Sequence, residues 1–391
     1  MFFKISTTVD DRFPVHFDLG QIVLNVDAGW KTHHQDHLQY VFKGYTEDAG
    51  WSPELLATAS DLELLGNFCV FCFDKIEQTV SMVTNRWRGM IIWNQPGEWI
   101  SNLDRGSYTI WNDSSIIIDQ NLEIAETKVD VIGDTNVTNI TASQLTDRVH
   151  QILDQRIGNF LKHNILPLKV FCSGGIDSTL VWSFIKRHTS DYELVLENRQ
   201  QWDYFWCRNR RQITQQFWAY QQIHHWLEPC VLTSGAPGDE FFFRSPVTVN
   251  LWCMYNDIDI FDLLRSGVGI LYDYFMLEKN QAVFRAQQSD RSLDEVMRKP
   301  PSEFNRYLCD IIVNDCQHWH LGNTLTFTPL RDLEIFKLFL NLNARDLIPQ
   351  IFNGEISRLL IYRNDPSLLD VMSDVKNVGE SLSKLAPLVP R

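Results

Sequence analysis

The sequence predicts two domains, a β-rich N-terminal half and an α/β C-terminal half built on a parallel sheet. Short runs of strand-forming residues with Gly, Asn and Asp between them recur through residues 1–140. After Thr141, apolar residues take helical spacing and lead into a strand, a Ser-Gly-Gly turn and another helix. A length of 391 residues also favours two domains, each large enough for its own core.

The individual elements follow from the same patterns. In the first half, strands are expected at Ile22–Val26, Phe68–Phe73, Thr79–Val83, Met90–Trp93 and Ser115–Ile118. In the second half, the apolar spacing from Leu145 to Leu161 predicts a helix. The stretch Asp134–Ala142 is rich in Thr and Asn, so we place the boundary there and expect domains at 1–140 and 141–391.

Charge and hydropathy limit the classes of function. A net charge of −14 argues against broad binding of nucleic acid or of an anionic membrane, because both depend on a basic surface. No apolar run approaches the roughly 18 residues of a membrane span. The start of the chain lacks the apolar run of a signal peptide, which predicts a cytoplasmic protein. Cys69 and Cys72 lie in an apolar strand-like run and are expected to be buried side chains, not redox or metal-binding thiols.

The run Phe171–Thr179 predicts an anion-binding turn. An apolar strand precedes Ser173-Gly174-Gly175, and residues at helical spacing follow it. Such a turn lets backbone N–H groups surround an anion, and the helix N-terminus adds partial positive charge. Asp177 would be repelled by that anion unless a divalent cation bridges the two.

The pattern Ser173-Gly174-Gly175-x-Asp177-Ser178 resembles the motif of PP-loop ATP pyrophosphatases. The resemblance implies an adenine nucleotide alpha hydrolase-like fold that splits ATP into AMP and pyrophosphate. The Gly-Lys-Ser/Thr ending of a Walker-type loop is absent. A second loop, Val231–Phe241, runs from an apolar strand through Gly and Pro to Asp239-Glu240, which would deliver two carboxylates to the carboxyl edge of the sheet.

Together, the β-rich half and the PP-loop half resemble the asparagine synthetase B-type family, in which an Ntn-type class II glutaminase sandwich precedes the synthetase domain. Besides the two loops, four segments are similar to that family in order: Leu65–Asp74, Asn85–Gly89, Thr328–Asp332 and Ser373–Asn377.

The chain departs from that family at the glutaminase. An active class II glutaminase needs Cys directly after the initiator Met, and Phe2 stands there. The Arg-Gly-Pro-Asp motif is missing from the first half as well. We therefore expect no glutamine hydrolysis, as in β-lactam synthetases and lasso-peptide cyclases, which use an amine of the substrate. Free ammonia is left open as the nitrogen source.

The resemblance implies roles for individual residues of an ATP-binding site. Ser173, Gly174, Gly175 and Ser178 would hold pyrophosphate, Asp177 and Asp239 would ligate Mg²⁺, and Glu240 and Lys376 would be catalytic. Cys172 and Gly238 would complete the ATP site. Glu240 would orient water or the amine, and Lys376 would stabilise developing negative charge. From the sheet edge alone, adenine is expected near Val170–Cys172 and the strand Tyr192–Leu196, within reach of Glu197 and Asn198.

The expected activity is an AMP-forming, ATP-dependent ligase that makes amide bonds. Its expected partners are a small-molecule or peptide carboxylate and ammonia or an amine, with no nucleic acid and no membrane; a homodimer is left open. Two other classes stay open: a PP-loop enzyme that modifies tRNA, and a degenerate synthetase kept as an ATP-binding scaffold. The aromatic segments Trp202–Trp206 and Trp252–Tyr255 would line an acceptor pocket or, as the base rate favours, belong to the core.

Overall fold

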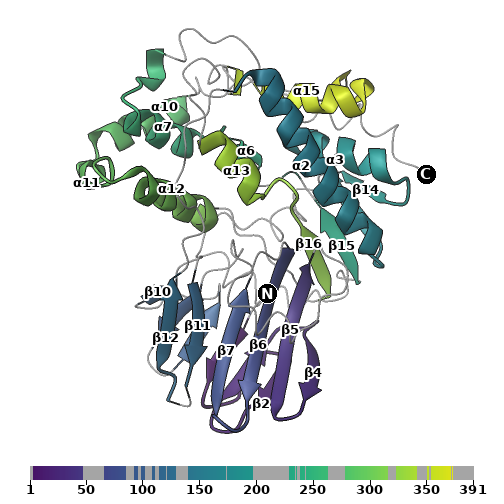
Figure 1. Ribbon diagram of the computed structural model, residues 1–391, viewed down its shortest axis with the longest axis vertical. Helices are drawn as coiled ribbons and strands as arrows, with labels where there is room; N and C mark the ends of the chain where they lie inside the picture. The colour runs from purple at the N-terminus through teal and green to yellow at the C-terminus, as the bar shows by residue number, and fades with distance from the viewer. Residues whose placement is uncertain are drawn as a thin grey trace.

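The computed structural model contains an all-antiparallel N-terminal part and a C-terminal part with a parallel sheet (Figure 1). It describes residues 3–46, 66–84, 92–95, 98–101, 108–110, 114–119, 121–128, 140–172, 174–196, 229–233, 235, 238–242, 244–262, 278–315, 323–340, 350–351, 354–370 and 372.

Two six-stranded antiparallel sheets form the N-terminal part. One sheet runs, in spatial order, β10 (Tyr108–Ile110), β8 (Ile92–Gln95), β9 (Glu98–Ser101), β1 (Phe3–Ser6), β3 (Val23–Val26) and β2 (Val15–Asp18). The other runs β12 (Ile124–Lys128), β11 (Ser114–Ile118), β7 (Thr79–Thr84), β6 (Gly66–Asp74), β5 (Leu38–Thr46) and β4 (Lys31–Gln35).

The two sheets pack face to face around a common core. In β6, Cys69 and Phe71 point into that core, whereas Phe68, Val70 and Cys72 belong to a separate cluster on the other face. This is the period-2 alternation of a strand, here buried on both sides. Cys69 and Cys72 therefore lie on opposite faces, which confirms that they are buried side chains and not a paired motif.

The C-terminal part is built on a parallel four-stranded sheet of order β14 (Glu193–Leu196), β13 (Leu168–Cys172), β15 (Cys230–Thr233) and β16 (Thr324–Phe327). The helices are α2 (Ala142–His163), α3 (Ile176–His188), α6 (Gly238–Phe241), α7 (Pro246–Tyr255), α10 (Glu278–Ser289), α11 (Leu293–Val296), α12 (Pro301–Asp315), α13 (Leu333–Leu340) and α15 (Glu355–Asn364), with a 3₁₀ turn η3 at Pro366–Asp370. The expected α/β organisation is confirmed at this level.

Helix α2 shows how local sequence produces these elements. Thr141 and Gln144 form a reciprocal capping box at its start, and Lys162 and His163 complement the dipole at its end. Its buried face carries Leu145, Val149, Leu153, Ile157 and Phe160 at helical spacing. α2, α3 and α15 contact one another, and α13 contacts α2 and α6.

An aromatic contact joins the two parts of the molecule. Tyr45 of β5 meets the ring of Phe160 of α2 at 4.9 Å and that of Phe327 of β16 at 5.9 Å between centroids. Phe160 and Phe327 stack at 3.9 Å. Accordingly, β16 lies beside the upper end of β5 in Figure 1.

Most expected strands are confirmed, with small shifts. The runs at Phe68–Phe73, Thr79–Val83 and Ser115–Ile118 all lie within observed strands. The strand expected from Ile22 begins at Val23, and the one expected at Met90–Trp93 is observed at Ile92–Gln95. Trp252 and Cys253 are buried in the core, as the base rate suggested, whereas Trp202–Trp206 lie outside the described residues. Among the described helices, none is long and apolar enough to cross a membrane.

The N-terminal part contains a buried ion pair. Lys43 Nζ donates to Asp27 Oδ2 at 2.7 Å and to the carbonyl of Ala28 at 2.7 Å, and Trp30 Nε1 donates to Asp27 Oδ1 at 2.8 Å. The side chains of Lys43 and Asp27 are 1% and 2% exposed. Burial lowers the pKa of Lys43, and Asp27 opposes that effect.

We predict that Lys43→Met alone destabilises the fold by about 3–5 kcal/mol, because it leaves the Asp27 carboxylate buried and unpaired. Adding Asp27→Asn should recover at least about 1 kcal/mol of that loss, because the neutral amide no longer needs a cation. Chemical denaturation of the single and double variants measures both quantities. Strictly additive effects would contradict a coupled buried pair.

Candidate functional site

The strand order reverses between β13 and β15, and their carboxyl ends mark the position at which open α/β sheets form a ligand-binding crevice. From β13 the chain first passes to β14 on one side and later returns to β15 on the other side. In open α/β sheets, ligands bind where the order reverses in this way, outside the carboxyl ends of the strands. The turn after Cys172 and the loop after Thr233 both leave from this edge.

The turn after β13 has the backbone that its glycines predict. Gly174 has a φ of +78°, a conformation that residues with a side chain rarely adopt. Gly175 is the N-cap of α3, and its carbonyl accepts from Thr179 N and from Ser178 Oγ, both at 3.0 Å. Cys172 is fully buried beside Ser178 Oγ at 3.8 Å, and burial raises the pKa of its thiol. A buried neutral thiol is a packing group here, since a nucleophile or metal ligand needs the thiolate.

Charges at the two ends of α3 match its dipole. Asp177 lies in the first turn, and Lys186, Arg187 and His188 lie in the last one. Basic side chains at a helix C-terminus interact favourably with the helix dipole. The N-terminus of this helix therefore lies at the carboxyl edge of the sheet, next to the end of β13.

The loop after β15 packs directly on the first turn of α3. A Cβ at Gly235 would overlap the backbone where Asp177 joins Ser178, and a Cβ at Gly238 would overlap the Asp177 carboxyl group. Gly238 N donates to the carbonyl of Gly235 at 2.8 Å and closes the turn before α6. The glycines therefore allow two segments about sixty residues apart in the sequence to touch through their backbones.

Arg244 joins the two loops electrostatically. Its Nη2 forms an ion pair with Asp177 Oδ1 and lies 3.5 Å from Asp239 Oδ1. Its backbone N–H donates to the carbonyl of Asp239 at 2.6 Å. The residue is only 1% exposed, and burial lowers its pKa to about 9, so the guanidinium is still charged at neutral pH.

Three predicted site residues thus come together, whereas others lie outside the described residues. Asp177 and Asp239 contact one guanidinium, and Gly238 packs against the Asp177 carboxyl group. Ser173, Lys376, Glu197 and Asn198 lie outside the described residues, and so does the side chain of Glu240. Their assigned roles stay predictions.

Asp332 has a structural role. Its Oδ1 accepts from the N–H groups of Glu334 and Ile335 at 2.8 and 3.0 Å and caps α13. Its Oδ2 accepts from Arg156 Nε of α2 at 3.0 Å. The segment Thr328–Asp332 therefore leads into a helix start, and both oxygens of the Asp332 carboxylate are used within the fold.

The residues as placed do not fit a magnesium ion. Within the described ranges, no group of three or more His, Cys, Asp or Glu side chains could hold a metal. The space between the Asp177 and Asp239 carboxylates is taken by a guanidinium, which would have to leave before a metal could bridge them. A magnesium site at Asp177 and Asp239 therefore stays a prediction.

Sequence reasoning missed Arg244. It is the only Lys or Arg between Arg211 and Arg265, and it follows the run Phe241-Phe242-Phe243 directly after the Asp-Glu pair. A single cation at the end of an apolar run, near two expected carboxylates, is the signal that could have identified it.

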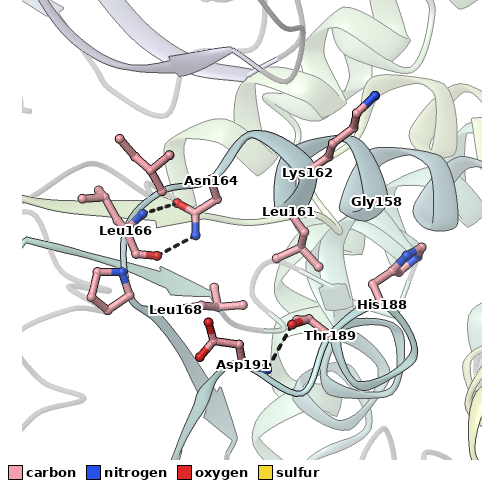
Figure 2. Close-up of a pocket in the computed structure, with 11 residues that line it drawn as sticks. Gly158, Leu161, Lys162, Asn164, Leu166, Leu168, His188, Thr189 and Asp191 are labelled. Carbon is pink, nitrogen blue, oxygen red and sulfur yellow. Dashed lines mark hydrogen bonds between the residues drawn. The ribbon is translucent and has the colours of Figure 1, made fainter.

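A cavity of about 620 Å³ lies at the opposite, amino-terminal edge of the sheet, between the ends of α2 and α3 (Figure 2). Asn164 uses its side-chain amide on the backbone of Leu166, donating at 2.7 Å and accepting at 3.1 Å. Thr189 Oγ1 accepts from the backbone N–H of Asp191. These polar groups serve the turns of the chain itself.

No protein-family model matches the chain, and a search of curated proteins found no match either. The candidate site therefore rests on the residues and geometry above.

We predict that Gly235→Ala destabilises the protein by about 1–3 kcal/mol, because the new methyl group must displace backbone of α3. Gly158→Ala in α2 is the matched control: its Cβ would meet only the movable ring of His188, at 3.1 Å. The control should be neutral or stabilising by up to about 1 kcal/mol, as a helical Gly→Ala change usually is. Thermal unfolding compares the two; equal effects would contradict the close approach of the loops.

Proposed function

We propose that this protein catalyses ATP-dependent amide-bond formation through an acyl-adenylate. The observation that carries the proposal is the meeting of the 172–179 turn and the 233–241 loop at the carboxyl edge of a parallel sheet, with Asp177, Asp239 and Arg244 between them. This is the edge at which α/β folds bind nucleotides. The PP-loop motif and the asparagine synthetase-like order of segments support the same proposal and supply its finer fold class.

In the first step, an oxygen of the substrate carboxylate attacks the α-phosphorus of ATP. The bond from that phosphorus to the bridging oxygen breaks, and pyrophosphate leaves with the electron pair. Several anions crowd together here, so the site must supply positive potential. The backbone N–H groups at the start of α3 and the helix dipole supply part of it, and the Arg244 guanidinium offsets the negative charge of Asp177.

In the second step, the nitrogen of ammonia or an amine attacks the acyl carbon. The bond from carbon to the AMP oxygen breaks, AMP leaves, and the nitrogen loses a proton. The resemblance assigns orientation of the amine to Glu240 and stabilisation of the acyl oxygen to Lys376. The substrate carboxylate belongs to a small molecule or a peptide.

The N-terminal part is proposed to lack glutaminase activity and to act as a platform. Besides Phe2, the packing around β1 supports this. Phe3 is fully buried and meets the Phe71 ring edge-on at 4.9 Å, and Trp30 lies 5.7 Å from Phe71 on the same core. The Lys43–Asp27 pair is linked to the same cluster by the hydrogen bond from Trp30 Nε1 to Asp27 Oδ1. Aromatic rings thus pack against Phe3 in this core.

The test is release of AMP and pyrophosphate from ATP with Mg²⁺, supplied with a pool of amino acids plus ammonia. We expect release that depends on one acid and that falls at least about tenfold in Asp177→Asn, because the carboxylate that orders Arg244 is lost. Asp191→Asn at the opposite edge of the sheet is the matched control and should turn over like the unmodified protein. Unfolding curves verify that both variants are folded.

Two other results separate the alternatives. ATP binding without turnover in that pool would direct the search to peptide substrates and keep the proposal. Absence of both ATP binding and turnover in the folded protein would contradict it and favour the scaffold, whereas turnover that needs tRNA would favour the RNA-modifying class.

A further inference from the structure

Arg244 stands where the two carboxylates of the site converge. It contacts Asp177 from α3 and Asp239 from α6, and with 1% of its surface exposed it is the largest fully buried side chain in the described structure. A buried charge costs several kcal/mol of desolvation unless it is paired. An arginine at the surface would avoid this desolvation cost. The buried position of Arg244 is therefore explained either by a bound ligand or by a structural role.

Two donors of the guanidinium are unused. Nε and Nη1 of Arg244 are buried and have no hydrogen-bond partner among the described residues; Nη2 alone faces the carboxylates. Each buried donor left in this state costs about 1–3 kcal/mol. A purely structural ion pair would be expected to satisfy all of its donors, as Arg156 comes closer to doing with Asp332 and Glu334.

One hydroxyl group at the same edge of the sheet shares this property. Thr233 Oγ1 at the end of β15 is buried without a hydrogen-bond partner within the described ranges. The Thr179 hydroxyl, in the first turn of α3, instead hydrogen-bonds with the Cys172 thiol.

We propose that Arg244 is the resident cation of this site and binds an oxyanion of the pyrophosphate type through Nε and Nη1, so that pyrophosphate binds without a divalent cation. The proposal shares its location with the proposed function but does not require turnover. It also accounts for the poor fit of magnesium, because the guanidinium already neutralises Asp177.

The local charge is compatible with an anion. Asp177 and Arg244 form a neutral pair, and the Asp239 side chain is 46% exposed, so water screens it. The start of α3, a helix of 13 residues whose N-cap Gly175 brings no side chain, adds positive potential. A multi-oxygen anion can reach donors on different edges of one guanidinium, which a single carboxylate oxygen cannot do.

The experiment is calorimetric titration of the full chain with sodium pyrophosphate, once in EDTA and once in Mg²⁺, at constant ionic strength. The unmodified protein should bind with affinities that agree within about threefold in the two conditions. Arg244→Gln should weaken binding in EDTA at least about tenfold, because charge-assisted hydrogen bonds are lost. Arg244→Lys keeps the charge but not the spread of donors and should fall between them.

Arg156→Gln is the matched control, because it removes another buried arginine of the same domain away from the crevice; it should lower stability and leave pyrophosphate affinity unchanged. Unfolding curves show which variants are folded, and Arg244→Lys keeps the test valid should Arg244→Gln not fold.

Two results would overturn the proposal. The first is binding by the unmodified protein only with Mg²⁺. The second is equal or tighter binding by Arg244→Lys and Arg244→Gln in EDTA, which would mean that Arg244 blocks the site. Pyrophosphate binding in EDTA without ATP turnover would support it while contradicting the proposed function.

Discussion

The ion pair between Asp177 and Arg244 is the interaction on which the rest of the site depends. One partner lies in the first turn of α3 and the other follows α6, so the pair connects two loops that leave adjacent parallel strands. A buried arginine cannot shed its charge at neutral pH, since its pKa is still about 9. The chain must therefore keep a carboxylate against it, and this requirement fixes the position of both loops.

Close packing allows that pair to form. The backbone at Gly235 lies where a side chain would overlap the start of α3, and Gly238 leaves room for the Asp177 carboxyl group. Behind the loops, α2 and β16 hold the sheet through stacked Phe160 and Phe327, to which Tyr45 adds the N-terminal part. The N-terminal part is thus attached through the same aromatic stack that packs against the parallel sheet. This attachment is compatible with the proposed role of the N-terminal part as a platform.

Local sequence patterns predicted the strands and helices better than they predicted the chemistry of the site. The Ser-Gly-Gly turn, the strand before it and the helix after it are where periodicity and glycine placement put them, because those signals are local. The close approach of Gly235 to α3 follows from parallel pairing of β13 with β15, which only strand order reveals. Arg244 could not be assigned to a partner from the sequence, because its carboxylates come from positions 67 and 5 residues away. Strand β8 ends at Gln95, two residues beyond the expected Trp93, because a local pattern defines the ends of an element less well than its type.

The most direct test of a single anion site is hydrogen exchange of the backbone with and without ATP. Thr179 N–H bonds to Gly175 in one loop, and Gly238 N–H bonds to Gly235 in the other. The account predicts that ATP slows exchange in both loops together and leaves Asn164–Leu168, at the opposite edge, unchanged. Slower exchange only at that opposite edge, or in neither loop despite bound ATP, would contradict it.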